Sequence, residues 1–143
     1  MGRFDMSHPF IVALDFDGTI KEGKSYDLSW KNWKLTPGFR SFYDWALHRG
    51  LHMVLWTCRN LEDSVEHYAV SSFLEREGIT EIGLSFETGN AYEHEGQVYT
   101  YWGTGSLKQY ADFYVDDLAI GCPLTVKGTP DWNKIRDLIE LGL

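Results

Sequence analysis

Two aspartates with one residue between them stand directly behind a short apolar run near the start of the chain. The run covers residues 10–14, Phe-Ile-Val-Ala-Leu, and the segment that follows is Asp15-Phe16-Asp17-Gly18-Thr19. A short apolar run that contains Ile and Val predicts a strand buried on both faces. In open α/β sheets, ligands bind beyond the carboxyl ends of the strands. Asp15 and Asp17 are therefore predicted to lie where chemistry usually takes place.

Other polar residues follow two further apolar segments. Thr57 ends the segment 51–56, Asp116 and Asp117 end the segment 113–115, and Lys108 lies shortly upstream of that last segment. In a parallel sheet these strand ends open on the same edge. Four carboxylates that meet there would repel one another unless a positive group lay among them. An all-oxygen ligand set suits Mg²⁺, and we expect this ion as the cofactor.

The elements that must position these residues follow from local patterns. The predicted strands are 10–15, 51–56, 79–86, 113–115 and the short apolar piece 124–126, with a hairpin within 89–105. The predicted helices run from an N-cap at Thr36 to Arg49, from a cap at Asn60 to Gly78, and from Pro130 to Gly142. Alternation of strand and helix predicts an α/β fold, a three-layer α/β/α sandwich with a mainly parallel, Rossmann-like sheet.

The pieces in this order resemble the haloacid-dehalogenase-like superfamily of phosphohydrolases. The resemblance rests on Asp-x-Asp-Gly-Thr at 15–19 after an apolar strand, a second strand that ends in Thr57, then Lys108, and a strand that ends in Asp116 and Asp117. The pieces span most of the chain. The chain looks most like the small bacterial and bacteriophage members that lack a cap domain, because Trp56-Thr57-Cys58-Arg59 and Pro130-Asp131-Trp132 fit that subgroup.

The resemblance implies a role for each residue near the phosphoryl group. Asp15 would be the nucleophile that attacks phosphorus and forms an aspartyl-phosphate. Asp17 would protonate the leaving oxygen and then take a proton from the water that cleaves the intermediate. Thr57 would donate a hydrogen bond to a phosphoryl oxygen, and Lys108 would neutralise negative charge on the phosphoryl group and on Asp15.

The resemblance also implies the metal ligands. The carboxylates of Asp15 and Asp116 would bind Mg²⁺ together with the backbone carbonyl of Asp17, and Asp117 would support the ion directly or through water. Members of the superfamily that displace halide lack an acid at the position of Asp17 and dispense with the metal. The acid at this position therefore favours phosphate chemistry.

Several roles stay open at the level of sequence. Arg59 either orients the substrate phosphate or pairs with Glu62 or Asp63. The aromatic side chains of two segments either cover the site or pack on the body of the protein. They are Trp30 and Trp33 in the segment 21–34, and Tyr92, Tyr99, Tyr101 and Trp102 in the hairpin region. His94, in the same region, either contacts substrate or is a solvated loop residue.

Composition and charge limit the function classes. The chain has 143 residues, 43% hydrophobic and 24% charged, which predicts one globular domain over 1–143. The stretches between Asp17 and Thr57 and between Thr57 and Lys108 are too short for a large cap domain. A net charge of −8 argues against nucleic acid as a partner. There is no apolar signal segment or membrane-length run, and two cysteines do not form a disulfide framework, so a cytoplasmic protein is expected.

The function that these observations favour is a Mg²⁺-dependent phosphatase. It would cleave a small phosphomonoester through an aspartyl-phosphate. One alternative is a non-catalytic protein that keeps the fold to bind a partner. Another is phosphoryl transfer to an acceptor other than water. A site without a cap would accept large substrates, rely on its neighbouring loops, or borrow cover from a second subunit, so homo-oligomers stay open.

Overall fold

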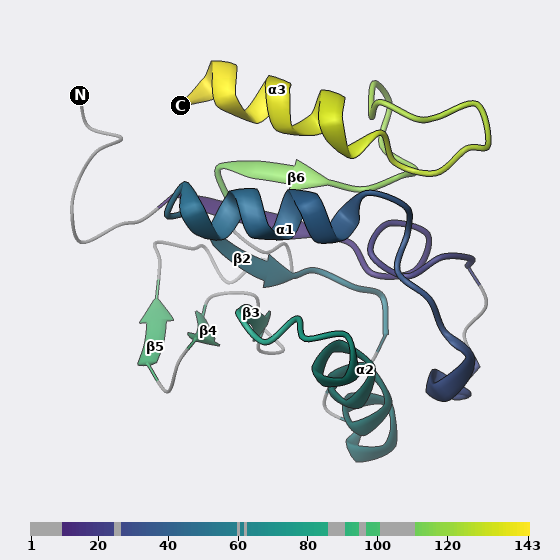
Figure 1. The fold of residues 1–143 in the computed structure, drawn as a ribbon. Helices are drawn as coiled ribbons and strands as arrows, with labels where there is room; N and C mark the ends of the chain where they lie inside the picture. Colours follow the sequence, from purple (N-terminus) through teal and green to yellow (C-terminus); the bar gives the residue numbers. More distant parts are fainter. Residues whose placement is uncertain are drawn as a thin grey trace.

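The strands of this protein form one mixed sheet. A computed structural model describes residues 10–24, 27–59, 61, 63–85, 91–94, 97–100 and 111–143. The strands are β1 (Ile11–Leu14), β2 (His52–Leu55), β3 (Ile82–Ser85), β4 (Ala91–His94), β5 (Gln97–Thr100) and β6 (Phe113–Val115). Within these residues the sheet has the order β5-β4-β3-β2-β1-β6 (Figure 1).

The central strands run parallel, and a hairpin extends one side of the sheet. β1 pairs in parallel with β2 and β6, and β2 pairs in parallel with β3. β4 and β5 continue the sheet in antiparallel fashion. The predicted mainly parallel sheet and the hairpin are thereby confirmed. Leu14 lies opposite both Leu55 and Val115, so the carboxyl ends of β1, β2 and β6 are level with one another.

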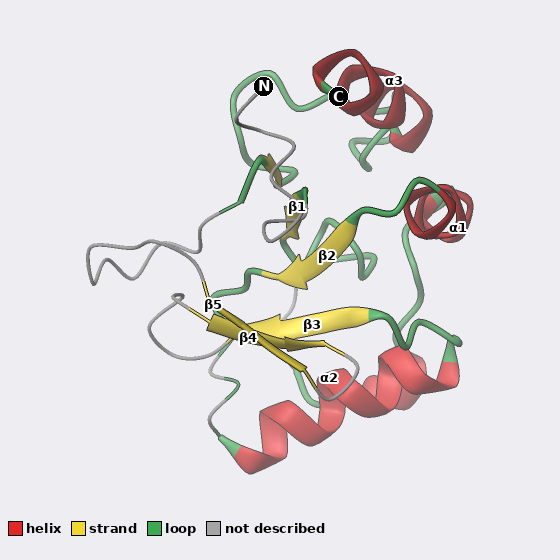
Figure 2. Ribbon diagram, turned by 90° about the vertical axis from the view of Figure 1, so that its left-hand side faces the viewer, coloured by secondary structure: helices red, strands yellow, loops and turns green. Residues whose placement is uncertain are grey.

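The described helices are α1 (Phe39–His48), α2 (Ser64–Arg76), α3 (Trp132–Gly142) and the short 3-10 helix η2 (Trp30–Asn32). Their buried residues join one hydrophobic core with Val12, Leu14, Met53 and Leu55, which share one face of the sheet. In Figure 2, α1 and α3 lie side by side and α2 lies below β3. On the opposite face, Ile11, Ala13 and Val54 are buried and pack against Trp56 and Ala111.

The fold is therefore α/β, and among the described residues no segment forms a large cap domain. In the described part of the connection from β1 to α1, the structure has η2, turns and isolated bridges. No helix in the part of the chain that the structure describes is long and apolar enough to cross a membrane.

Two helix caps differ from expectation. Gly38, and not Thr36, is the N-cap of α1, because the Thr36 hydroxyl is used elsewhere. It donates to the backbone oxygen of Thr19 at 2.6 Å and accepts from Trp132 Nε1 at 3.0 Å. Thr36 thus links the turn after β1 to α3. For α2, Asp63 accepts from two backbone amides as the N-cap, whereas Asn60 lies outside the described residues.

The apolar piece 124–126 does not form a strand of the sheet, so this prediction was wrong. Leu124 makes only an isolated bridge to Pro130. The segment closes a tight turn, in which Thr125 N donates to Thr129 O and Gly128 N donates to Thr125 O. Leu124 and Val126 remain exposed, because the turn holds them away from the core.

Candidate metal centre and active site

Three carboxylates meet where β1 and β6 end. The two strands are neighbours, and Asp15 N donates to Val115 O at 2.9 Å, so the chain segments leave the sheet side by side. One oxygen from each of Asp15, Asp116 and Asp117 lies within 4.8 Å of the others. The structure thus brings together three of the four acids that the sequence placed at this edge.

The electrostatics of this group favour a bound cation. The pKa of Asp15 rises from an ordinary 3.8 to about 7, first because the carboxyl is partly buried and then because Asp116 and Asp117 carry like charge nearby. Hydrogen bonds from Thr19 and from the Phe16 backbone act in the opposite direction without cancelling this effect. A divalent cation would remove the repulsion, and hard cations prefer an all-oxygen donor set of this kind.

Thr19 ties the two strand ends together, a role that the sequence analysis missed. Its buried hydroxyl lies 3.1 Å from Asp15 Oδ2 and 3.2 Å from Asp117 Oδ1, and it accepts a hydrogen bond from Asp117 N at 3.0 Å. A hydroxyl has one proton, so it donates to one carboxylate at a time. A Thr four residues after Asp15, in the first turn beyond the strand, is the signal that could have revealed this role.

Gly18 permits the close approach of this turn to Asp117. Its φ of +84° is in the left-handed region that favours glycine, and a Cβ built there would lie 2.8 Å from Asp117 Oδ2. The backbone conformation and the space at this position therefore both call for glycine.

Gly18→Ala is expected to lower the free energy of unfolding by about 1–3 kcal/mol, because a side chain at positive φ is strained. It should also displace Asp117 and weaken Mg²⁺ binding, measured by calorimetry. Gly50→Ala is the matched control, since Gly50 has φ +76° and nothing within 4 Å of the added Cβ. Equal effects of the two variants on both measurements would show that the contact with Asp117 is unimportant.

Asp17 is separated from the other acids by a buried ion pair. Arg59 Nε donates to Asp17 Oδ2 at 2.8 Å and Arg59 Nη2 donates to Asp17 Oδ1 at 2.9 Å. The side chains of Arg59 and Asp17 are 0% and 6% exposed. Lys21 Nζ lies a further 3.4 Å from Asp17 Oδ1. Both oxygens of Asp17 thus face cationic donors, and its side chain is not among the three grouped carboxylates.

Arg59 pairs with Asp17, a partner that the sequence analysis did not name. Its guanidinium is bidentate on Asp17, donates to the backbone oxygen of Asp27 at 3.1 Å, and lies 4.7 Å from the centre of the Trp33 ring. Asp63 caps α2 instead of pairing with it, and Glu62 lies outside the described residues. Spacing in sequence gave no sign of this partner because Asp17 and Arg59 follow different strands.

Thr57 lies at the expected edge of the sheet. Trp56 N donates to Leu14 O at 2.8 Å, so the chain after β2 emerges beside Asp15. The Thr57 hydroxyl oxygen accepts from Arg59 N at 3.1 Å, which shapes the turn that leads toward α2. Lys108, the expected phosphate-binding lysine, lies outside the described residues. A lysine that the sequence analysis did not single out, Lys24, places its Nζ 3.1 Å from Asp117 Oδ2.

The two tryptophans near the site pack on α2. Trp33 is buried and makes edge-to-face contacts with Phe16 and Phe73, and Trp30 contacts Tyr68 in the same way. Trp30 and Trp33 thus pack on the body of the protein, which is the second of the two alternatives that the sequence left open for them. His94 and the aromatic residues of the hairpin region have side chains outside the described part of the structure.

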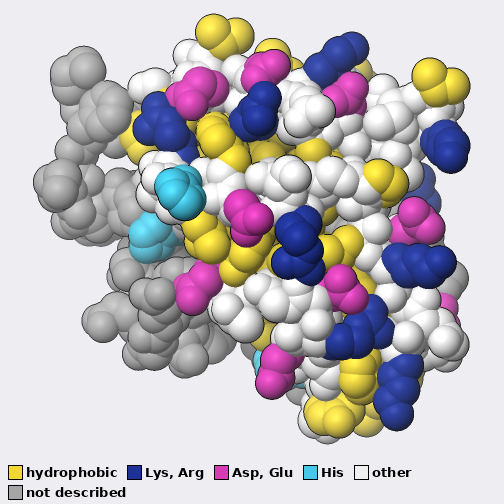
Figure 3. Space-filling view, viewed as in Figure 1, with side chains coloured by type: hydrophobic (Ala, Val, Ile, Leu, Met, Phe, Trp, Pro, Cys, Tyr) yellow, Lys and Arg dark blue, Asp and Glu magenta, His cyan; other side chains and the backbone are white. Residues whose placement is uncertain are grey.

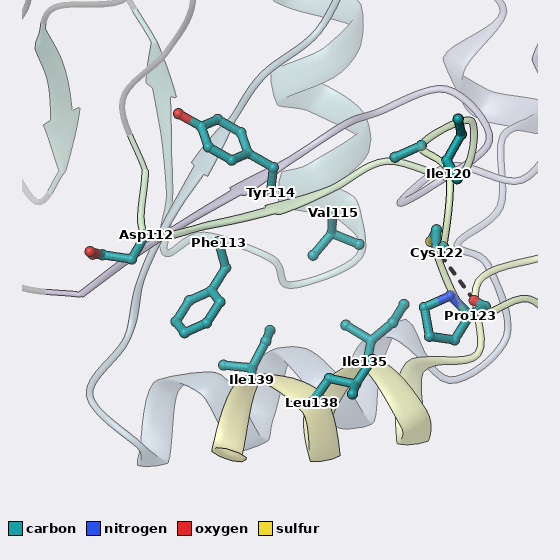
Figure 4. A pocket seen from close by; sticks show the side chains of 12 residues that line it. Asp112, Phe113, Tyr114, Val115, Ile120, Cys122, Pro123, Ile135, Leu138 and Ile139 are labelled. Atoms are coloured by element: carbon teal, nitrogen blue, oxygen red, sulfur yellow. Dashed lines mark hydrogen bonds between the residues drawn. The ribbon is translucent and has the colours of Figure 1, made fainter. Parts of the chain in front are cut away.

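An apolar hollow of about 400 Å³ lies between β6 and α3. Phe113, Val115, Ile135 and Ile139 line it (Figure 4), together with the loop that contains Cys122. None of the three grouped carboxylates lines this hollow. The hollow therefore does not include the candidate metal centre.

Comparisons with known proteins support the fold alone. No family model matches the sequence, and no curated protein matches it. A solved structure of a conserved protein from Bacteroides thetaiotaomicron is similar over 95% of this chain and 93% of that one, with a TM-score of 0.59 and 23% sequence identity. This likeness agrees with an α/β fold whose sheet is mainly parallel.

Proposed function

We propose that this protein is a Mg²⁺-dependent phosphohydrolase of the small capless haloacid-dehalogenase-like type. It would cleave a phosphomonoester through an aspartyl-phosphate on Asp15. The observation that carries the proposal is the group of three carboxylates, Asp15, Asp116 and Asp117, at the ends of two adjacent parallel strands. This donor set fits Mg²⁺, and the Thr19 hydroxyl holds two of its members in place.

In this proposal each residue acts from the position described above. Asp15, Asp116 and Asp117 would hold Mg²⁺, which would offset negative charge on the phosphoryl group and on the nucleophile. One carboxylate oxygen of Asp15 attacks phosphorus in line, and the bond to the leaving oxygen breaks as that oxygen takes a proton from Asp17. The hydroxyl of Thr57 donates to a phosphoryl oxygen, and water then hydrolyses the aspartyl-phosphate and returns Asp15 to its starting form.

The environment of Asp17 favours a second candidate function. A general acid must bring a proton on an exposed oxygen to the leaving group. Both oxygens of Asp17 instead accept from Arg59, which remains buried. For catalysis, Asp17 must release at least one of these contacts when substrate binds. A protein that never releases them would bind a metal and an anion without turnover, which is the non-catalytic alternative.

A phosphate-release assay distinguishes these functions. The purified protein is offered a panel of phosphomonoesters with Mg²⁺, with EDTA, and with Mg²⁺ plus an alcohol acceptor. The proposal expects phosphate release that requires Mg²⁺ and no acceptor. Metal binding without turnover on every substrate would support the binding protein, and turnover that depends on the alcohol would support phosphoryl transfer.

Mg²⁺ is expected to stabilise the protein against heat. At a free concentration 100-fold above Kd, one bound ion adds about 2.7 kcal/mol to the free energy of unfolding, which raises Tm by roughly 8–10 °C for a domain of this size. Differential scanning calorimetry with and without Mg²⁺ measures the shift. Asp116→Asn, which removes one ligand, should reduce it, and an equal shift in that variant would place the ion elsewhere.

The same ion should remove the pH dependence of stability that Asp15 contributes. Its pKa of about 7 in the folded protein lies above the ordinary 3.8, so between these values the folded state holds a proton that the unfolded chain releases. Without metal, this group therefore makes the free energy of unfolding fall as the pH rises from about 4 to about 7. Saturating Mg²⁺ favours the ionised carboxylate and removes that fall. Urea titrations across this pH range test both statements.

A further inference from the structure

A second hollow lies beside the candidate metal centre. Its volume is about 570 Å³, and it is lined by the loop that joins β1 to α1, with Lys21, Lys24, Lys34, Ser29, Asn32 and Trp33 among its residues. Polar atoms form the larger part of its lining, in contrast to the apolar hollow beneath β6. A hollow of this size accommodates a small polar ligand or one end of a larger one.

The positive charge of this loop is unusual for the chain. Lys21, Lys24, Lys31 and Lys34 are four of the seven lysines in a protein whose net charge is −8. Three of these four line the hollow, with Glu22 and Asp27 as the acids. Figure 3 shows Lys and Arg side chains, with Asp and Glu among them, along the right-hand side of the molecule, and Figure 1 draws this loop in the lower part of that side. In an acidic protein, lysines gathered on one loop attract an anion to that loop.

The walls of the hollow are held in place by contacts with the protein body. Arg76 of α2 donates to the backbone oxygens of Lys31 at 2.9 Å and Trp33 at 2.6 Å. Trp33 Nε1 donates to Asp27 Oδ1 at 2.9 Å, and Glu22 N donates to Lys34 O at 2.8 Å. The hollow is therefore preorganised, which lowers the entropic cost of binding a ligand there.

Two of the lysines join the hollow to the acids of the site. Lys24 Nζ lies 3.1 Å from Asp117 Oδ2, and its side chain is 58% exposed. Lys21 is buried, lies 3.4 Å from Asp17 Oδ1, and donates to the backbone oxygen of Gly23 at 3.1 Å. A molecule with its phosphoryl group at Asp15 can thus extend toward Lys24 and the exposed Lys34.

We propose that this hollow binds a second anionic group of the substrate, a phosphate or a carboxylate, while the phosphoryl group to be cleaved lies at Asp15. The inference rests on the proposed function and narrows its substrate class. The preferred substrates are phosphomonoesters that carry another negative group a few bonds away. Lys24 and Lys34 provide the direct contacts, and Ser29 and Asn32 supply uncharged hydrogen-bonding groups beside them.

The test compares kcat/KM for substrates that differ only in the second group. Fructose 1,6-bisphosphate is paired with fructose 6-phosphate, and phosphoglycolate is paired with ethyl phosphate. The fructose pair tests whether the hollow binds a second phosphate, and the glycolate pair tests whether it binds a carboxylate. The wild-type protein is expected to prefer the member with the second anion in at least one pair. Lys34→Gln should reduce that preference about tenfold, the effect of one lost charged hydrogen bond. Lys127→Gln, which changes an exposed lysine that does not line the hollow, is the matched control.

The outcomes separate this inference from the proposed function. Turnover with equal kcat/KM within both pairs would overturn the inference and leave the phosphatase in place. The same holds if Lys34→Gln keeps the full preference. If no substrate is turned over, the proposed function fails. Calorimetric titration with inorganic pyrophosphate then measures anion binding at the hollow without the need for turnover. Binding that Lys34→Gln weakens about tenfold supports an anion site there, and the absence of binding overturns it.

Discussion

Asp15→Asn is expected to lower Mg²⁺-dependent phosphate release by at least about 10³-fold, because the amide is a poor nucleophile and a poor metal ligand. Asn preserves the shape of the side chain and its place beside Thr19. It also removes one of three like charges from a crowded group, so the folded state should not be destabilised. Initial rates on the best substrate of the panel measure the loss, and circular dichroism checks the fold.

The control for this variant is Asp137→Asn, which removes an exposed carboxylate on α3 that is not one of the three grouped acids. It should retain wild-type rates. If Asp15→Asn releases phosphate as fast as the wild-type protein, Asp15 is not the nucleophile, and the group of carboxylates then serves metal binding alone. Rates that fall equally in both variants would point to a general effect of lost charge.

Arg59→Met is expected to lower the free energy of unfolding by about 3–5 kcal/mol, because it leaves the buried carboxylate of Asp17 without its bidentate partner. The pair is 0% and 6% exposed, so water cannot replace the lost contacts. Lys21, 3.4 Å from Asp17 Oδ1, remains and favours the lower end of this range. Urea denaturation monitored by tryptophan fluorescence gives the value.

Two comparisons show whether burial of the pair is the cause. Arg49→Met removes an arginine that donates to Glu140 Oε1 at 3.0 Å on the surface, and it should change stability little. The double variant Asp17→Asn with Arg59→Met should recover much of the loss, because no unpaired charge is then left in the interior. A loss in Arg59→Met no larger than in Arg49→Met would contradict the importance of the buried pair.

The sequence was sufficient to predict the strands, and the acids at their ends, where the local pattern and the tertiary structure favour the same conformation. The apolar run before Asp15 forms β1, and the run before Asp116 forms β6. Both strands are short and the sheet is parallel, so the rule that strand ends share an edge placed Asp15, Asp116 and Asp117 together. The hairpin followed from alternation and the last helix from its predicted start at Pro130, and the structure adds that Asp131 is the N-cap of that helix.

The sequence was insufficient to predict local structure where a side chain has several possible partners. Thr36 looks like a helix cap, but its hydroxyl bonds to the Thr19 backbone oxygen in the turn after β1 and to Trp132 on α3, and both are distant from it in sequence. The apolar residues of 124–126 suggested a strand. The turn around Gly128 keeps them out of the sheet instead. Local propensity is weak compared with such contacts, so these two predictions failed.

The amino-acid order alone was enough to predict that Asp15, Asp116 and Asp117 lie together at the ends of β1 and β6, because the alternation of strand and helix indicates where each strand ends. Tertiary structure decided the state of Asp17 and the place of the lysines. Arg59 is 42 residues away from Asp17 and reaches it because β1 and β2 are adjacent. Lys24 reaches Asp117 because the turn at Gly18 brings the loop back toward β6. Pairing between charges depends on distance in space, and a pattern along the chain does not contain that distance.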